Sequence, residues 1–202
     1  MNSPYINRPV KVSRVMLKVL LALLPAIAVY IYFFGIGIAV QIALGVATAL
    51  LAESLILKLR GKPIKPFLYD LSAVLTAVLL ALCLPPTAPW WMIVLGTLFA
   101  IVLAKHAFGG LGHNIFNPAM VGFAVLIIAY PALMGQWIAP QGVLAASASM
   151  SDQLHLIFMG GLPQSAYDAI ATATPLDAMK TGLRNPSWDV QAIWVNGNSP
   201  IF

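Results

Sequence analysis

Charged residues are scarce in this sequence, and apolar residues dominate it. Of the 202 residues, 8% are charged and 60% are hydrophobic, and the mean hydropathy is +0.89. A soluble domain carries about 25% charged residues, so this chain has too few to cover a water-facing surface. The composition therefore excludes a soluble globular domain. It predicts an all-α polytopic membrane protein, because a helix satisfies its backbone hydrogen bonds within each span.

Cysteine is almost absent as well. Cys83 is the single cysteine in the sequence, which excludes an intrachain disulfide and any cysteine cluster that could hold zinc or iron–sulfur. No internal repeat or low-complexity tract is visible. No arrangement of a nucleophile with a general base stands out either, so we predict no catalytic residue and no metal centre in this chain.

Basic residues gather in two regions of the sequence. One is the N-terminal segment and the other is the region 58–66; they contain Arg8, Lys11, Arg14 and Lys18, and Lys58, Arg60, Lys62 and Lys65. Short segments rich in Lys and Arg stay in the cytoplasm, so both regions are predicted to be cytoplasmic, with two spans between them. The net charge of +5 then reflects orientation in a lipid bilayer, and we predict no nucleic-acid partner.

About five apolar segments are predicted to cross the membrane, at 16–34, 36–57, 67–84, 91–104 and 119–133. Most are near the ~20 residues that a transmembrane helix needs, and the fourth is short. Trp90 and Trp91 follow a loop without basic residues, in the interfacial position where indoles concentrate. Lys105 and His106 end the fourth segment, and we interpret them as interfacial anchors.

The stretch from Gly109 to Met120 interrupts this pattern. Its twelve residues include three glycines, two asparagines, a histidine and a proline, which are unfavourable in a helix. Irregular backbone at membrane depth is tolerated where protein or water covers it. We predict a discontinuous or re-entrant segment near the cytoplasmic side, where His113, Asn114 and Asn117 could line an ion or flavin path.

The C-terminal region has a different composition. Between residues 139 and 202, four acids face two bases, a net charge of −2; they are Asp152, Asp168, Asp177 and Asp189, and Lys180 and Arg184. An odd number of spans before this region and its negative charge both predict an extracytoplasmic location. We therefore divide the chain into a transmembrane helical bundle at 1–138 and an extracytoplasmic loop region at 139–202.

Thr174 begins the most specific motif of that region. Thr174 is positioned as a helix N-cap, Pro175 as the first helical residue and Asp177 as its third, a variant of the capping box. One interpretation is a capped short helix with a structural role only. The other adds a function, because a helix N-terminus with free amides binds anions. A phosphate on the Thr174 hydroxyl would lie among several donors.

Glu53 and Asp70 are the acids that fall inside predicted spans. An intramembrane carboxylate is a functional-site hypothesis, and these two could coordinate or relay Na⁺ or H⁺. Each lies ~7 Å along a helix from a lysine, Lys58 and Lys65 respectively. The alternative is that each acid pairs with such a snorkelling side chain near the interface.

Several stretches together resemble one family. They are Ser3-Pro4-Tyr5, Ala52-Glu53, Asp70, the run from Pro85 to Trp91, the run from Gly109 to Met120, and the run from Ala173 to Asp177. On these motifs the chain resembles the NqrB/RnfD family, and within it the D component of the Rnf complex, an ion-translocating ferredoxin:NAD oxidoreductase. It is more distantly similar to the B component of the sodium-translocating NADH:quinone reductase.

This resemblance implies a covalent FMN. In the family a threonine carries FMN through a phosphoester bond, attached by a flavin transferase that reads Asp-x-x-Ser/Thr-Gly-Ala-Thr. Asp168 lies six residues before Thr174, and Ala173 with Thr174 matches the end of that motif. Ala171 and Thr172 depart from it, and Thr172 offers a second hydroxyl. The spacing favours Thr174 as the FMN anchor.

The resemblance also implies further properties. They are a second, non-covalent flavin (riboflavin), other subunits of an Rnf-type complex, coupling to Na⁺ or H⁺, and a bacterial inner membrane. Family members continue with more spans after the extracytoplasmic segment, so we expect this chain to be truncated relative to them. The expected function is a membrane flavoprotein subunit that couples electron transfer to ion translocation. The alternative is a secondary transporter or channel-like protein with a broken-helix substrate site and no flavin.

Overall fold

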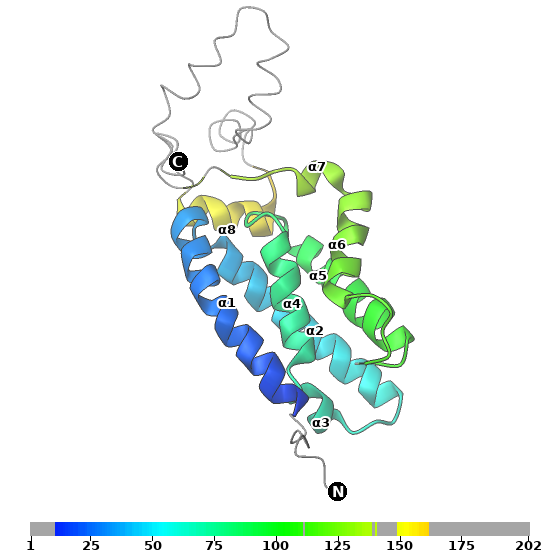
Figure 1. Cartoon of the computed structure of the whole chain (residues 1–202). Helices are drawn as coiled ribbons and strands as arrows, with labels where there is room; N and C mark the ends of the chain where they lie inside the picture. Colours follow the sequence, from blue (N-terminus) through cyan, green and yellow to red (C-terminus); the bar gives the residue numbers. More distant parts are fainter. Residues whose placement is uncertain (1–10, 111, 139, 141–148, 162–202) are drawn as a thin grey trace, which may run out of the picture.

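The fold of this protein comes from a computed structural model, which describes residues 11–110, 112–138, 140 and 149–161. All elements of regular structure in these residues are helices (Figure 1), which confirms the predicted all-α class. The helices are α1 (Val12–Phe34), α2 (Gly37–Leu59), α3 (Ile64–Leu68), α4 (Ser72–Cys83), α5 (Trp90–Leu98), the π-helix η1 (Phe99–Ala107), α6 (Pro118–Ala129), α7 (Pro131–Met134) and α8 (Met150–Met159).

Four helical segments are long and apolar enough to cross a membrane. They are α1, α2, the pair α3–α4 (Ile64–Cys83) and the pair α5–η1 (Trp90–Ala107). These four agree with the first four predicted spans. The fifth predicted span is divided, because α6 ends at Ala129 and α7 begins at Pro131, where proline removes a backbone donor from the helix.

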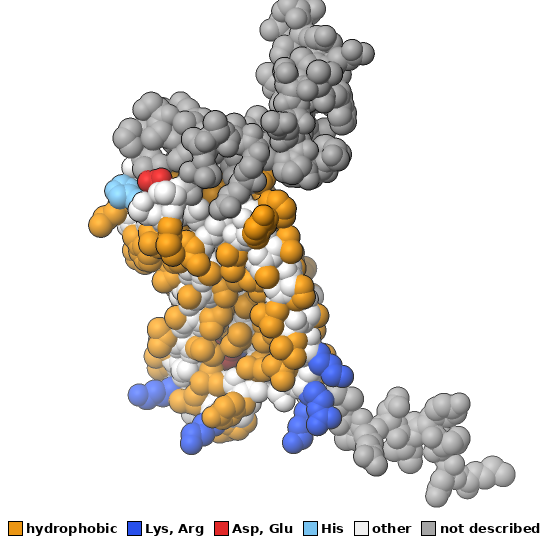
Figure 2. Space-filling view, turned by 90° about the vertical axis from the view of Figure 1, so that its left-hand side faces the viewer, with side chains coloured by type: hydrophobic (Ala, Val, Ile, Leu, Met, Phe, Trp, Pro, Cys, Tyr) orange, Lys and Arg blue, Asp and Glu red, His pale blue; other side chains and the backbone are white. Residues whose placement is uncertain are grey.

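The helices α1, α2, α4, α5 and α6 lie side by side as one bundle (Figure 1). The start of α1 and the connection between α2 and α3 lie at the same end of the bundle. Lys and Arg side chains gather at this end, and the sides of the bundle are largely apolar (Figure 2). We call it the basic end. Its basic residues are Lys11, Arg14, Lys58, Arg60, Lys62 and Lys65.

Helix α1 lies at the edge of the bundle, against α2 and α4. None of its residues is buried, and large apolar side chains such as Leu21, Leu24 and Val29 are more than half exposed. Apolar side chains exposed over a whole helix would be unfavourable in water and are favourable in lipid. This surface agrees with a multi-pass membrane protein.

Small residues form much of the bundle interior. One buried cluster joins α2, α4 and η1 through Ala49, Ala52, Ala73, Ala77 and Ile101. Helices α5 and α6 cross at Gly96 and Gly122, where a Cβ on Gly122 would lie 2.5 Å from the carbonyl oxygen of Gly96. Membrane helices associate through such small residues, because these allow close backbone approach without a hydrophobic driving force.

The third span is not continuous. Helix α3 ends at Leu68 and α4 begins at Ser72, and Leu71 between them has a φ of 62°. Asp70 Oδ1 accepts hydrogen bonds from the backbone N–H of Ser72 at 2.7 Å and from its hydroxyl at 2.5 Å. A carboxylate before a helix N-terminus satisfies a free amide and interacts favourably with the helix dipole. Asp70 therefore fixes where α4 begins.

The end opposite the basic end is closed by α8, which lies across the bundle (Figure 1). The Gln153 side chain of α8 is buried and accepts a hydrogen bond from the N–H of Gly37 at 2.9 Å. Ser149 and Asp152 form a capping box at the start of α8. Hydrogen bonds from Ser149 hold the pKa of Asp152 below its usual range. The hydrogen bond between Gly37 and Gln153 attaches α8 to the turn between α1 and α2.

We expect Gly122→Ala to lower the free energy of unfolding by about 1–3 kcal/mol, because the added methyl group overpacks the crossing of α5 and α6. Thermal unfolding of the chain in detergent measures this change. Gly135→Ala is the matched control, since a Cβ there would lie 3.6 Å from its nearest neighbour, an ordinary van der Waals contact. Equal melting temperatures for the two variants would contradict the close crossing.

Candidate functional site

Glu53 and Lys105 form an ion pair inside the bundle. The ammonium nitrogen of Lys105 lies 2.5 Å from Glu53 Oε1, and the two side chains are 3% and 0% exposed. Glu53 comes from α2 and Lys105 from η1, 52 residues later. A buried charge is very costly unless it is paired and hydrogen-bonded. The burial of each of these two charges therefore depends on its pairing with the other.

His106 lies beside the same carboxylate. Its Nε2 is 3.6 Å from Glu53 Oε1, and its side chain is 6% exposed. The prediction that Lys105 and His106 are interfacial anchors is wrong, because both are buried against Glu53. The π-helix contributes to the difference, since its i→i+5 hydrogen bonds change the helical register, and η1 here buries three consecutive residues, Ala104, Lys105 and His106.

The polar contacts continue from Lys105 to α4. The Lys105 ammonium also donates a hydrogen bond to the hydroxyl oxygen of Ser72, at 2.7 Å. The Ser72 hydroxyl donates in turn to Asp70 Oδ1. We call Glu53, Lys105, Ser72 and Asp70 the polar relay. It connects a fully buried carboxylate to the half-buried Asp70 near the basic end.

The relay shows where the two predicted intramembrane acids lie. The structure brings Glu53 and Asp70 to opposite ends of one chain of polar contacts. The ion partner of Glu53 is Lys105 of another span rather than Lys58, and Asp70 bonds to Ser72 rather than to Lys65. Among the described residues, neither acid forms the local pair with a snorkelling lysine that was the alternative prediction.

Two buried polar atoms beside the ion pair lack a hydrogen bond to any described residue. They are Glu53 Oε2 and His106 Nε2. A buried, unsatisfied carboxylate oxygen costs free energy, and a water molecule or a cation bound there would remove that cost. No group of three or more His, Cys, Asp or Glu side chains in this part of the chain could hold a metal ion.

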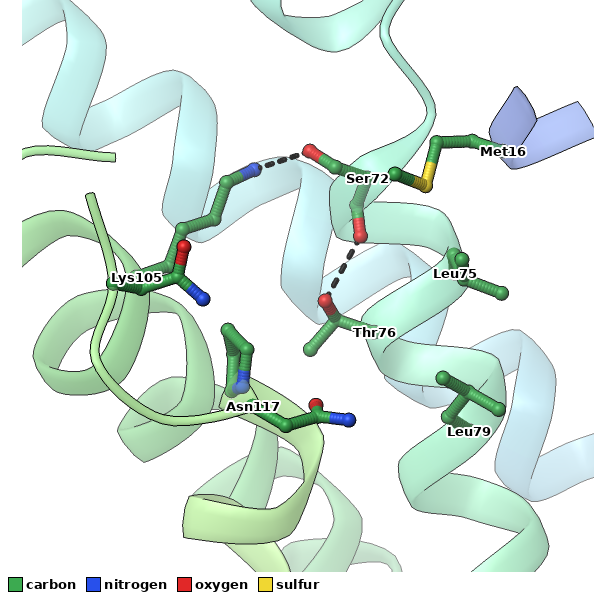
Figure 3. Close-up of a pocket in the computed structure, with 9 residues that line it drawn as sticks. Met16, Ser72, Leu75, Thr76, Leu79, Lys105 and Asn117 are labelled. Atoms are coloured by element: carbon green, nitrogen blue, oxygen red, sulfur yellow. Dashed lines mark hydrogen bonds between the residues drawn. The ribbon is translucent and has the colours of Figure 1, made fainter. Parts of the chain in front are cut away.

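A cavity of about 160 Å³ lies next to the relay (Figure 3). Figure 3 shows Lys105 extending from η1 toward Ser72, with Thr76 one turn further along α4. The lining is polar at Ser72, Thr76, Lys105, Asn114 and Asn117, and apolar at Met16, Leu75, Leu79 and Pro118. Pockets for drug-sized ligands measure about 300–1,000 Å³. The cavity therefore fits several water molecules or a hydrated ion and is too small for a flavin.

The glycine-rich stretch forms one wall of that cavity. Its residues 109, 110 and 112–117 lie in turns, bends and irregular backbone rather than a helix, and φ is positive at Gly109, Gly110 and Gly112. Asn117 caps α6 by accepting from the N–H of Ala119 at 3.0 Å. The discontinuity is present where we predicted it. Asn114 and Asn117 line the cavity, whereas His113 is exposed.

Thr174 and Asp168, the predicted flavin-attachment residues, lie outside the described residues. The structure also adds Ser72, Lys105 and His106, which the sequence did not identify as site residues. One signal was available for Lys105 and His106. A buried Glu53 carboxylate is stable only beside a cation. The predicted span 91–104 has fourteen residues, which is too short to reach from one interface to the other. The residues that follow it, Lys105 and His106, could therefore have been expected within the membrane.

Comparisons with known proteins agree with these motifs. A family model described as the NQR2, RnfD, RnfE family matches residues 1–199. The chain belongs to this family.

Several curated relatives in the NQR2, RnfD, RnfE family are named as the D component of an ion-translocating oxidoreductase complex. The Escherichia fergusonii protein is 48% identical over 192 residues, which cover 91% of this chain and 54% of the relative. The Salmonella typhimurium protein is 48% identical over 191 residues, with the same two coverages. The Shewanella amazonensis protein is 47% identical over 185 residues, 90% of this chain and 53% of the relative. The chain thus spans about half the length of these relatives.

We expect Lys105→Met to lower the free energy of unfolding by about 3–5 kcal/mol, because it leaves the Glu53 carboxylate buried and unpaired. The double variant Glu53→Gln/Lys105→Met removes both charges and recovers most of that loss. Thermal unfolding in detergent compares them, with the exposed Lys58→Met as the control. Equal stability of Lys105→Met and the double variant would mean that the Glu53 carboxylate does not depend on pairing with Lys105.

Proposed function

We propose that this chain belongs to a membrane flavoprotein subunit of an ion-translocating ferredoxin:NAD oxidoreductase complex. Membership of the NQR2, RnfD, RnfE family is the observation that carries the proposal. The name of its relatives, the D component of an ion-translocating oxidoreductase complex, agrees with it. The other subunits of such an Rnf-type complex would then be its partners.

Thr174 is the proposed anchor of a covalent FMN. Asp168 and the Ala173-Thr174 pair match the sequence that a flavin transferase reads in the Rnf family. The FMN supplies the electron-transfer chemistry, and the protein fixes its position and environment. The predicted N-cap at Thr174 would add backbone donors for the phosphate. A second, non-covalent flavin is part of the proposal, and the cavity next to the relay is too small for it.

The polar relay is the proposed ion path. Asp70 is half-buried near the basic end and can accept Na⁺ or H⁺ from the aqueous side, while Glu53 offers a buried carboxylate. Ionisable residues inside membrane bundles mark ion and proton pathways. The basic end supports an orientation with the N-terminus in the cytoplasm and the flavin-bearing loop in the periplasm of an inner membrane.

Covalent flavin is tested by a denaturing gel viewed under ultraviolet light. We expect a fluorescent band for the chain isolated from cells that express the flavin transferase. Thr174→Ala removes the hydroxyl that carries the phosphoester, so fluorescence is lost, whereas the matched control Thr172→Ala remains fluorescent. A dark wild-type band would contradict the flavoprotein proposal and favour a transporter with a broken-helix site.

The ion path is tested by Asp70→Asn. Asparagine still accepts the Ser72 N–H bond at the helix start, so the fold is preserved while the charge is lost. We expect ion pumping by the assembled complex to fall about ten-fold, measured as uptake into vesicles. The control Asp152→Asn removes one carboxylate at the opposite end. Unchanged pumping by Asp70→Asn would exclude Asp70 from the path.

A further inference from the structure

Lys105 lies between two carboxylates and beside a cavity. Its ammonium donates to Glu53 Oε1 and to the Ser72 hydroxyl oxygen, and that hydroxyl donates to Asp70. The lysine ammonium is a compact charge on a flexible four-carbon stem. A movement past Ser72 would therefore take the ammonium away from Glu53 and toward Asp70. A lysine with only a structural role would be satisfied by Glu53 alone, without a second carboxylate and a cavity on its other side.

The cavity gives the ammonium a second place to lie. Its volume of about 160 Å³ is well above the roughly 10–15 Å³ of cavity volume that one water molecule needs, so it holds several water molecules. Ser72, Thr76, Asn114 and Asn117 provide polar atoms in its lining. An ammonium that turned from Glu53 into this cavity would find hydrogen-bond acceptors and water, and it would avoid the apolar exterior of the bundle.

Glu53 has one carboxylate oxygen without a hydrogen bond to the described part of the chain. This oxygen, Oε2, is buried, while Oε1 is held by Lys105. A cation that bound both carboxylate oxygens would therefore replace the ammonium. A monovalent cation then neutralises Glu53 as the ammonium did, and the displaced ammonium lies in the polar cavity on the side of Asp70. A divalent ion would leave an extra buried charge, which is costly.

We propose that Lys105 is a tethered counter-ion that competes with the transported monovalent cation for Glu53. In one state the ammonium pairs with Glu53. In the other, Na⁺ or a proton occupies Glu53 and the ammonium lies in the cavity beside Ser72. Return of the ammonium to Glu53 releases the cation. This inference rests on the proposed ion-translocating function, and it makes Lys105 a positioning residue for release.

The test uses the assembled complex in proteoliposomes. Electron transfer is recorded together with ²²Na⁺ uptake and with a pH-sensitive dye, which gives the number of ions moved per electron. Lys105→Met removes the competing charge, so Glu53 retains its cation, and ions per electron fall about ten-fold while electron transfer continues. Lys58→Met removes an exposed lysine near the same end and keeps the wild-type ratio.

Ser72→Ala provides a second test if the complex that carries Lys105→Met does not assemble. It deletes one hydroxyl group, leaves the Glu53–Lys105 pair intact and removes the first acceptor on the way to the cavity. We expect a several-fold lower number of ions per electron. Ser54→Ala is its matched control, because the Ser54 hydroxyl donates to the carbonyl of Leu50 in its own helix. A merely structural role would lower the amount of complex and leave the ratio unchanged.

The outcomes separate this inference from the proposed function. Wild-type ratios in Lys105→Met, or in Ser72→Ala where the lysine variant does not assemble, would overturn the tethered counter-ion and leave ion translocation intact. A wild-type complex that transfers electrons and moves neither Na⁺ nor H⁺ would contradict the proposed function and this inference together. A lower ratio in the variants with normal flavin content supports both.

Discussion

The ion pair between Glu53 and Lys105 is the interaction on which the interior of this bundle depends. Both side chains are almost fully excluded from solvent, so neither charge could lie there without the other. The pair connects α2 to η1, and the Ser72 hydroxyl adds α4 to the same contact. Buried alanines of α2 and α4 pack with Ile101 of η1 and let the same three helices approach closely. Polar contacts and small residues together fix the arrangement of three spans.

Three segments of irregular backbone lie near this pair. The bulky Leu71 adopts a left-handed φ directly before Ser72, and the π-helix η1 carries Lys105 and His106. Left-handed φ at such a residue costs about 1–3 kcal/mol and is found where function requires it. π-Helical turns are likewise frequent at functional sites. The glycine-rich stretch, a third irregular segment, completes the wall of the adjoining cavity. These three segments thus lie where polar groups enter an otherwise apolar bundle.

In the proposed function, ion binding by the relay and electron transfer by the flavin take place in different parts of the molecule. The relay lies nearer the basic end, because Glu53 is about 9 Å along α2 from Leu59. The C-terminal region begins at the other end, where Gln153 bonds to Gly37 and α8 lies across the bundle (Figure 1). Coupling of ion movement to electron transfer would then require the helices of the bundle to transmit a conformational change from one end to the other. The small-residue crossings, such as Gly96 with Gly122, define how rigidly these helices are held.

The sequence by itself determined the membrane class, the helical segments and the position of the discontinuity, because hydropathy, glycine and proline act locally along the chain. It also identified Glu53 and Asp70, since an acid within an apolar run is unusual. It misjudged Lys105 and His106, because a cation after a short apolar run has the same local pattern as an interfacial anchor. Only the tertiary structure decided their role. It packs η1 beside a carboxylate 52 residues away, and the free energy of burying a charge depends on that distant partner and not on sequence neighbours.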